Sequence, residues 1–265
     1  MKATLAIVRR EFLKFLRNRG RILNSVIQPL FLVFIFSFVT SSISVGTVSS
    51  IQFLIFGIIG ITAFSSSMSE AVSFIHDKKS GFVKEYLISP ITRTQLVLGR
   101  IVGDSLKGIF DAIILVVISV FAGCQYTVLS FALIMFSVLI VCMGGAALGL
   151  FIAFNVKTEK EFSARIGLTM LFGMFLSGAY IPLTLFPSYL RFIVYINPLT
   201  YLTNYFRYIS LSSLGVIYED LVQQGIIVKI LGYSVVPIYP FILFAFLSIL
   251  FIRSDVKRFK NINRS

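Results

Sequence analysis

Hydrophobic residues occur in this chain in stretches that are too long for the elements of a soluble fold. Residues 22–69 and 112–156 contain no Asp, Glu, Lys or Arg. One helix crosses the hydrocarbon layer of a membrane with about 20 apolar residues, so each stretch is long enough for two crossings. A composition of 57% hydrophobic and 13% charged residues also exceeds the apolar content that a soluble domain buries. The pattern therefore predicts an all-α membrane protein.

The same pattern divides the chain into six expected spans within a single transmembrane domain, residues 1–265. Hydropathy places the spans at 22–44, 51–75, 101–122, 129–154, 164–186 and 232–252. The outer segment 187–231 is also apolar, yet prolines and charged residues interrupt it. We expect short re-entrant helices there that enter the outer leaflet and return, covered by protein wherever the backbone is irregular.

The positions of the basic residues predict the orientation of these spans. Of the 24 Lys and Arg residues, all but Arg191, Arg207 and Lys229 lie in four segments, 1–21, 76–107, 155–165 and 253–265. Lys and Arg accumulate in cytoplasmic segments, so we expect a multi-pass protein of the cell (plasma) membrane with both termini in the cytoplasm. A net charge of +13 distributed in this way indicates topology and argues against a nucleic-acid partner.

The start of the chain, residues 1–21, predicts an amphipathic helix at the membrane interface. At helical spacing its apolar face includes Phe12 and Phe15, and Arg10, Lys14 and Arg17 lie opposite. The apolar face would lie in the inner leaflet, and the cations would meet anionic headgroups of membrane lipid. Simple anchoring and docking of a partner protein both fit this helix.

The cytoplasmic loop 76–100 is expected to lead into the helix of the third span. Ser89 followed by Pro90 fits an N-cap and a first helical residue. Gly81 permits a sharp turn earlier in the loop. We therefore expect a new helix to begin at Ser89.

A short amphipathic segment lies between that turn and that helix. Its apolar side chains Phe82, Tyr86 and Leu87 stand beside Lys84 and Glu85. An apolar knob with charged flanks suits a shallow cleft on another protein, and an ordinary interfacial loop is the alternative.

The third expected span begins with an intramembrane charge cluster. Asp104, Lys107 and Asp111 are spaced three and four residues apart, so they share one helix face and Lys107 can pair with both acids. Charges inside a span face protein or water. An ion relay is one interpretation, and a structural cluster that fixes the inner end of the span is the favoured one.

The fourth expected span contains a pair of glycines, Gly145 and Gly149, at Gly-x-x-x-Gly spacing. Such a pair lets two helices approach closely. Packing within the chain is favoured over a seam between two copies.

Two further stretches carry a resemblance to a known family. The first contains Asp77, Gly81, Glu85, Ser89, Pro90, Gly99 and Arg100. The second contains Ser177, Gly178, Pro182, Pro187, Leu190, Asn197, Pro198, Tyr201 and Arg207. In this order and spacing they resemble the ABC-2-type permeases, the membrane-spanning subunits of ABC exporters. The chain departs from that pattern at Tyr189, where Trp is common, and at Asp77, where Glu is usual.

The resemblance implies a permease that pairs with a second permease copy, in a homodimer or a heterodimer, and binds separate ABC ATPase subunits. It also implies that the loop after the second span is a coupling helix that contacts the ATPase. The resemblance also implies that substrate is exported, as in multidrug efflux. ATP and Mg would bind to the partner ATPase.

Motifs for catalysis are absent from the sequence. No Gly-x-x-x-x-Gly-Lys-Ser/Thr phosphate loop occurs, so we expect ATP hydrolysis on another chain and no enzyme activity, cofactor or metal on this one. Two other functions stay open at this point. One is an ion-coupled secondary transporter, although such proteins usually contain an internal repeat and the two halves show no convincing similarity. The other is a non-transporting membrane scaffold subunit.

Overall fold

The computed structural model describes residues 2–17, 19–41, 50–81, 91–230 and 233–261, and nearly all of its regular structure is helical. The elements are α1 (Lys2–Arg17), α2 (Arg19–Ser41), α3 (Ser50–Glu70), α4 (Val72–Lys79), α6 (Arg93–Phe121), α7 (Val128–Phe154), α8 (Glu159–Phe175), η1 (Leu183–Leu185), α9 (Ser188–Ile196), α10 (Pro198–Ser212), α11 (Tyr218–Gln223), β1 (Val228–Ile230), β2 (Tyr233–Val235) and α12 (Ile238–Asn261). The two short strands pair antiparallel.

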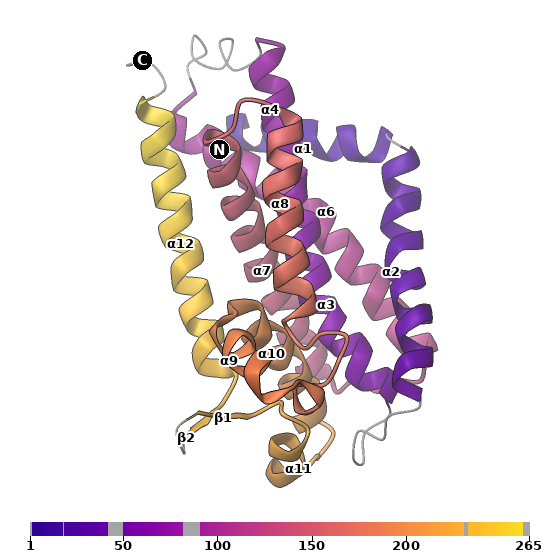
Figure 1. Ribbon diagram of the computed structural model, residues 1–265. Coiled ribbons are helices and arrows are strands. Elements are labelled where there is room, and N and C mark those ends of the chain that lie inside the picture. Colours follow the sequence, from indigo (N-terminus) through magenta and orange to yellow (C-terminus); the bar gives the residue numbers. More distant parts are fainter. Residues whose placement is uncertain (1, 18, 42–49, 82–90, 231–232, 262–265) are drawn as a thin grey trace.

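The long helices run side by side in one bundle (Figure 1). Helix α1 lies across one end of the bundle, where α12 also ends, and α9, α10, α11 and the strands lie at the opposite end. Among the described residues, three helical stretches are long and apolar enough to cross a membrane, namely Ile51–Lys79, Val128–Phe154 and Ile238–Phe259. A shorter apolar stretch, Ile22–Ile35, lies in α2. The architecture is that of a helical membrane protein.

Helix α3 occupies the centre of the bundle. The apolar side chains of residues 53–59 are at most 1% exposed. Helix α7 reaches the α3 backbone because it lacks side chains where the two helices meet: a Cβ at Gly145 would lie 2.5 Å from the carbonyl oxygen of Phe64, and one at Gly149 would lie 2.3 Å from that of Met68. The predicted glycine pair is thus confirmed as a contact within the chain.

The helix that leads into the third expected span begins at Arg93 and not at Ser89. Thr92 Oγ1 accepts a hydrogen bond from Gln95 N at 3.3 Å, and Gln95 Oε1 accepts one from Thr92 N at 3.1 Å. This reciprocal capping box satisfies backbone donors at the first turn of α6. The assignment of the N-cap of this helix to Ser89 is therefore wrong, and residues 89 and 90 themselves lie outside the described part of the chain.

Helix α8 ends at Phe175, well before residue 186, where the fifth span was expected to end. The chain turns at Gly178, whose φ of +76° is a conformation that glycine adopts without strain. Asn197, at the start of α10, donates a side-chain hydrogen bond to the carbonyl oxygen of Gly173 at 3.0 Å. A polar turn held by α10 therefore replaces the last part of the expected helix.

The segment 187–231 is anchored to the bundle by Arg207 of α10, which is fully buried. Its Nε donates to the carbonyl oxygen of Phe53 at 2.9 Å, and its Nη2 donates to that of Ala179 at 2.8 Å. The guanidinium carbon also lies 3.6 Å from the centroid of the Phe53 ring. There is room for the guanidinium because residue 57 is glycine, where a Cβ would lie 2.3 Å from Nη2. One side chain thus joins α10, α3 and the turn after α8.

Candidate functional site: an ion-pair network where α1, α4 and α6 meet

Helix α1 packs against α6 through glycines. Ile7, Glu11 and Phe15 recur every fourth residue and are buried. A Cβ at Gly99 would lie 3.2 Å from Ile7 Cβ, and one at Gly103 would lie 2.9 Å from Glu11 Cβ. The two glycines therefore form the surface that lets α1 approach the α6 backbone closely.

This packing corrects the predicted orientation of α1. Phe15 faces protein, with its ring centroid 5.3 Å from that of Phe110 on α6. Phe12 is 41% exposed, so the two phenylalanines do not share one environment. Arg17 lies on the exposed side of the helix. The sequence pattern identified an amphipathic helix but did not show that its buried stripe would contain the acidic residue Glu11.

Asp77 of α4 is the acceptor on which the cations of α1 converge. Arg10 Nη2 lies 2.9 Å from Asp77 Oδ1 and its Nη1 lies 3.3 Å from Oδ2. Lys14 Nζ lies 3.3 Å from Asp77 Oδ1 and 3.4 Å from Glu11 Oε1. Arg10 and Lys14, which were expected to face lipid headgroups, thus hold α1 on α4.

Arg100 of α6 approaches the same acids from inside the protein. Its Nη1 lies 2.6 Å from Asp77 Oδ2 and 3.3 Å from Glu11 Oε1, and its Nε lies 3.2 Å from Asp104 Oδ2. Its Nη2 also donates to the Ser73 hydroxyl on α4. Bonds to three carboxylates and a hydroxyl use the planar fork of donors that arginine carries and lysine lacks.

The network balances its own charge. Three cations, Arg10, Lys14 and Arg100, meet three carboxylates, those of Glu11, Asp77 and Asp104. The side chains of Arg100, Glu11 and Asp77 are each 5% exposed, and that of Asp104 is 0% exposed. Removing one partner from such a buried set leaves an uncompensated charge, so the set behaves as a unit.

The network brackets the loop that sequence analysis assigned to ATPase coupling. Asp77 and Arg100 lie near the two ends of the predicted loop 76–100, Asp77 in α4 and Arg100 in the second turn of α6. Gly81, with a φ of +81°, ends the described part of α4 and its turn. The other predicted coupling residues lie outside the described residues; they are Phe82, Lys84, Glu85, Tyr86, Leu87, Ser89 and Pro90.

The predicted cluster of Asp104, Lys107 and Asp111 is divided between different partners. Asp104 pairs with Arg100, and Asp111 accepts a hydrogen bond from the Ser66 hydroxyl on α3. No ion pair joins Lys107 to either acid within the described part of the chain. The expected pairing of Lys107 with Asp104 is therefore wrong, because Arg100 lies one turn earlier on the same face and takes Asp104, whereas Lys107 interacts with Asp111 electrostatically without a direct ion pair.

Sequence reasoning missed Glu11 and Ser73 as members of the network. Glu11 carries a local signal in its three-residue spacing to Lys14, but no local rule indicates its contact with Arg100, and Ser73 has no local signal. Arg100 and Asp104 did carry a signal in their spacing of four residues. Asp77 and Arg100 were noted as family positions, and the structure supplies a physical reason for their co-occurrence, a direct ion pair.

Comparison with known proteins finds one family and several relatives. The profile of the ABC-2 type transporter family matches residues 2–211. A chain named transport permease ycf38 in Porphyra purpurea is 30% identical over 213 residues, which cover 77% of this chain and 72% of the relative. The inner membrane transport permease YadH of Escherichia coli (strain K12) is 24% identical over 161 residues, 60% of this chain and 62% of the relative.

A third relative is named for a multidrug substrate class. YbhR of Escherichia coli (strain K12), named as a multidrug ABC transporter permease, is 25% identical over 163 residues, 61% of this chain and 44% of the relative. The family match includes every residue of the network and the buried Arg207. Together with its membrane-length helices, this match shows that the chain belongs to the ABC-2 type transporter family and is a membrane permease of an ABC transporter.

Proposed function

We propose that this permease receives the movement of its ATPase partner through the loop between α4 and α6, and that the ion-pair network passes this movement to α1 and α6 together. Permeases of this family lack an ATPase domain and carry no cofactor, so ATP is hydrolysed by a separate ABC ATPase subunit. The observation that carries the proposal is the position of Asp77 and Arg100, which pair with each other at the two ends of the loop.

The stiffness of the network supports this role. Separating a buried ion pair is costly, of the order of 3–5 kcal/mol when one partner is removed. A push on the loop would therefore move α4, α6 and α1 as one body before it broke their ion pairs. Only residue 18 separates α1 from α2, so the first expected span would move with them.

The surrounding architecture belongs to the same proposal. The permease is a protein of the cell membrane with six spans and with both termini in the cytoplasm. Two copies of it enclose the substrate path of an exporter. Basic segments 1–21 and 253–265 support this orientation, as does the position of α1 at the same end of the bundle as the C-terminal end of α12 (Figure 1). Apolar side chains such as Phe34, Leu168 and Ile242 are about 60% exposed, and lipid or a second permease copy would cover them.

The alternatives make different use of the same residues. An ion-coupled transporter would need Asp104 to exchange its ion during transport, whereas Asp104 is fully buried and paired with Arg100. This pairing favours the structural role of the charge cluster. A scaffold subunit would share the fold, and a flux measurement separates it from a permease.

The test is reconstitution of the chain with its ATPase partner. The loop variant Phe82→Ala/Glu85→Ala/Tyr86→Ala is expected to lose either assembly with the ATPase or transport-coupled ATP hydrolysis. The network variant Asp77→Asn leaves the loop intact, so it is expected to retain assembly and to transport less substrate per ATP hydrolysed.

The matched control is Glu159→Gln, which removes an exposed carboxylate that pairs with Lys79 at 3.0 Å in the same region of the fold. Exposed ion pairs contribute little to the stability of a fold, so this variant should assemble with the ATPase and couple like the unmodified permease. If the loop variant and Asp77→Asn both assembled and coupled like the unmodified permease, the coupling role would be wrong.

A further inference from the structure

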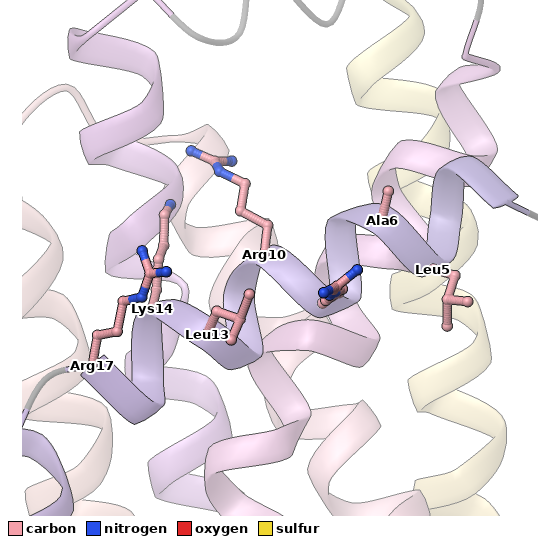
Figure 2. Close-up of a pocket in the computed structure, with 7 residues that line it drawn as sticks. Leu5, Ala6, Arg10, Leu13, Lys14 and Arg17 are labelled. Atoms are coloured by element: carbon pink, nitrogen blue, oxygen red, sulfur yellow. The ribbon is translucent and has the colours of Figure 1, made fainter.

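An open groove of about 510 Å³ runs along the exposed side of α1. Figure 2 shows that a single helix supplies its lining, with Arg10 and Lys14 projecting to one side of the helix and Leu5 to the other. The lining contains four cations, those of Arg9, Arg10, Lys14 and Arg17, and no acidic residue. The chemistry of this groove is thus that of a receptor for a negative charge.

One row of the groove alternates leucine and arginine. Leu5, Arg9, Leu13 and Arg17 recur every fourth residue, so they lie one above the other on α1. Leu5 is 69% exposed and Leu13 is 37% exposed. The two arginines are separated by eight residues, or about 12 Å along a helix.

The arginines of this row are available to a ligand. Arg9 and Arg17 are exposed and form no ion pair within the part of the chain that the structure describes. Arg10 and Lys14, in the neighbouring row, are the two residues that hold Asp77. The groove therefore combines two cations that form no ion pair with any described residue and two that belong to the ion-pair network.

We propose that this groove binds an anionic phospholipid, with its phosphate between the guanidinium groups of Arg9 and Arg17 and its acyl chains against Leu5 and Leu13. Guanidinium groups bind phosphate with paired hydrogen bonds. A soluble anion or an acidic protein surface would use the cations but leave the leucines exposed to water, whereas a lipid uses both. Helix α2, which contains the apolar stretch Ile22–Ile35, begins at Arg19, and this supports a position of the groove at the membrane surface.

The lipid site does not depend on the coupling role proposed above. Only the side of the membrane follows from that proposal, which places α1, and therefore the bound lipid, at the cytoplasmic leaflet. Occupation of the site has a consequence for stability. A phosphate held by Arg9 and Arg17, which lie two turns apart on α1, is bound only when α1 is helical, so its binding favours the folded state. Anionic lipid is therefore expected to stabilise the fold.

The test uses the purified permease in neutral detergent, without any ATPase. Its thermal unfolding midpoint is measured with added phosphatidylglycerol, phosphatidylcholine or inorganic phosphate. Phosphatidylglycerol should raise the midpoint by roughly 5 °C, since a ligand that binds only the folded state stabilises it. Phosphatidylcholine and inorganic phosphate should have little effect.

Two double variants remove the same amount of charge from different places. Arg9→Gln/Arg17→Gln removes the arginines of the groove, and Lys160→Gln/Lys257→Gln removes two exposed lysines outside it. The first variant should unfold at an unchanged midpoint without lipid and lose the response to phosphatidylglycerol, and the second should keep that response. Arg9→Lys/Arg17→Lys retains the charge and should keep part of it.

Two results would overturn the proposal. The first is an equal response to phosphatidylglycerol in the groove variant and the unmodified permease; if that variant also failed to assemble with the ATPase, the groove would be a protein-docking surface. The second is an equal response of the unmodified permease to inorganic phosphate and to phosphatidylglycerol, which would indicate a site for soluble anions. Neither result bears on the loop variant that tests coupling.

Discussion

At the scale of single residues, Arg100 is the side chain that joins α1, α4 and α6 at one end of the bundle. It contacts Glu11 of α1, Asp77 and Ser73 of α4, and Asp104 of its own helix. Each of these groups is buried, so water does not compensate for any that loses its partner. The energetic importance of Arg100 lies in keeping three carboxylates neutralised away from water.

Replacing Arg100 by glutamine is expected to destabilise the permease by about 3–5 kcal/mol. The amide cannot neutralise the carboxylates, which then repel one another in a buried space. Thermal unfolding in detergent measures the loss as a fall in the midpoint of roughly 10 °C.

Arg165→Gln is the control for that substitution. Arg165 pairs with Glu161 at 2.8 Å on α8, but both side chains are well exposed. Removing an exposed pair costs about 1 kcal/mol or less. Equal losses in the two variants would show that burial of the network contributes nothing.

The sequence predicted part of this network, and the limit has a physical cause. The one-turn spacing of Arg100 and Asp104 is visible in the sequence because helix geometry makes such neighbours meet. The same rule wrongly assigned Lys107 to Asp104, since it cannot rank two cations on one face. Glu11 reaches the network from a different helix, and no local rule brings residues 11 and 100 together.

At the scale of elements, α1 illustrates what hydrophobic periodicity does and does not determine. The pattern predicted its helical, amphipathic character, and the structure contains a helix over Lys2–Arg17. It did not predict which face is buried, because a buried glutamate counts as polar in any pattern although Arg100 and Lys14 neutralise it. Its docking surface on α6 was also invisible, since glycines carry no hydrophobic signal.

Substituting alanine for Gly103 tests this docking. The new Cβ would lie 2.9 Å from Glu11 Cβ, which is closer than two non-bonded carbon atoms come in folded proteins. Helix α1 would therefore have to shift away from α6, and this shift would strain the ion pairs between the two helices. We expect a destabilisation of roughly 1–3 kcal/mol from overpacking, measured as a lower unfolding midpoint.

Gly167→Ala provides the matched comparison. Gly167 also lies inside a helix, yet a Cβ there would meet nothing within 4 Å. Alanine favours a helix interior over glycine by roughly 0.5–1 kcal/mol, so this variant should be neutral or more stable. If Gly103→Ala behaved like Gly167→Ala, close packing of α1 on α6 would not matter.

At the scale of the whole molecule, composition and hydropathy were sufficient for the class of protein. The long uncharged stretches predicted a helical membrane protein, and the family match confirms an ABC-2 type permease. The ends of the helices were less predictable: the capping box at Thr92 fixes where α6 begins, and contacts from α10 fix where α8 ends. Six spans and the orientation of the termini stay predictions.

Cysteine labelling in cells tests that orientation. In a Cys124→Ser background, Gln125→Cys and Lys157→Cys place thiols in two exposed loops at opposite ends of α7, which is long enough to cross a membrane. A membrane-impermeant maleimide should label residue 125 in intact cells and residue 157 only after permeabilisation. Cys142 is buried and should stay unlabelled in both. Labelling of both positions from outside would contradict the proposed topology.

Arg207 has a consequence for how proteins of this kind diversify. Two of the groups that accept its hydrogen bonds are main-chain carbonyls, of Phe53 and Ala179, and every amino acid supplies such a carbonyl. Other residues at positions 53 and 179 would supply the same two acceptors, whereas Arg207 itself and the space left by Gly57 have to be kept. Sequence change elsewhere in α9, α10 and α11 can therefore accumulate during evolution without loss of this attachment of α10 to α3.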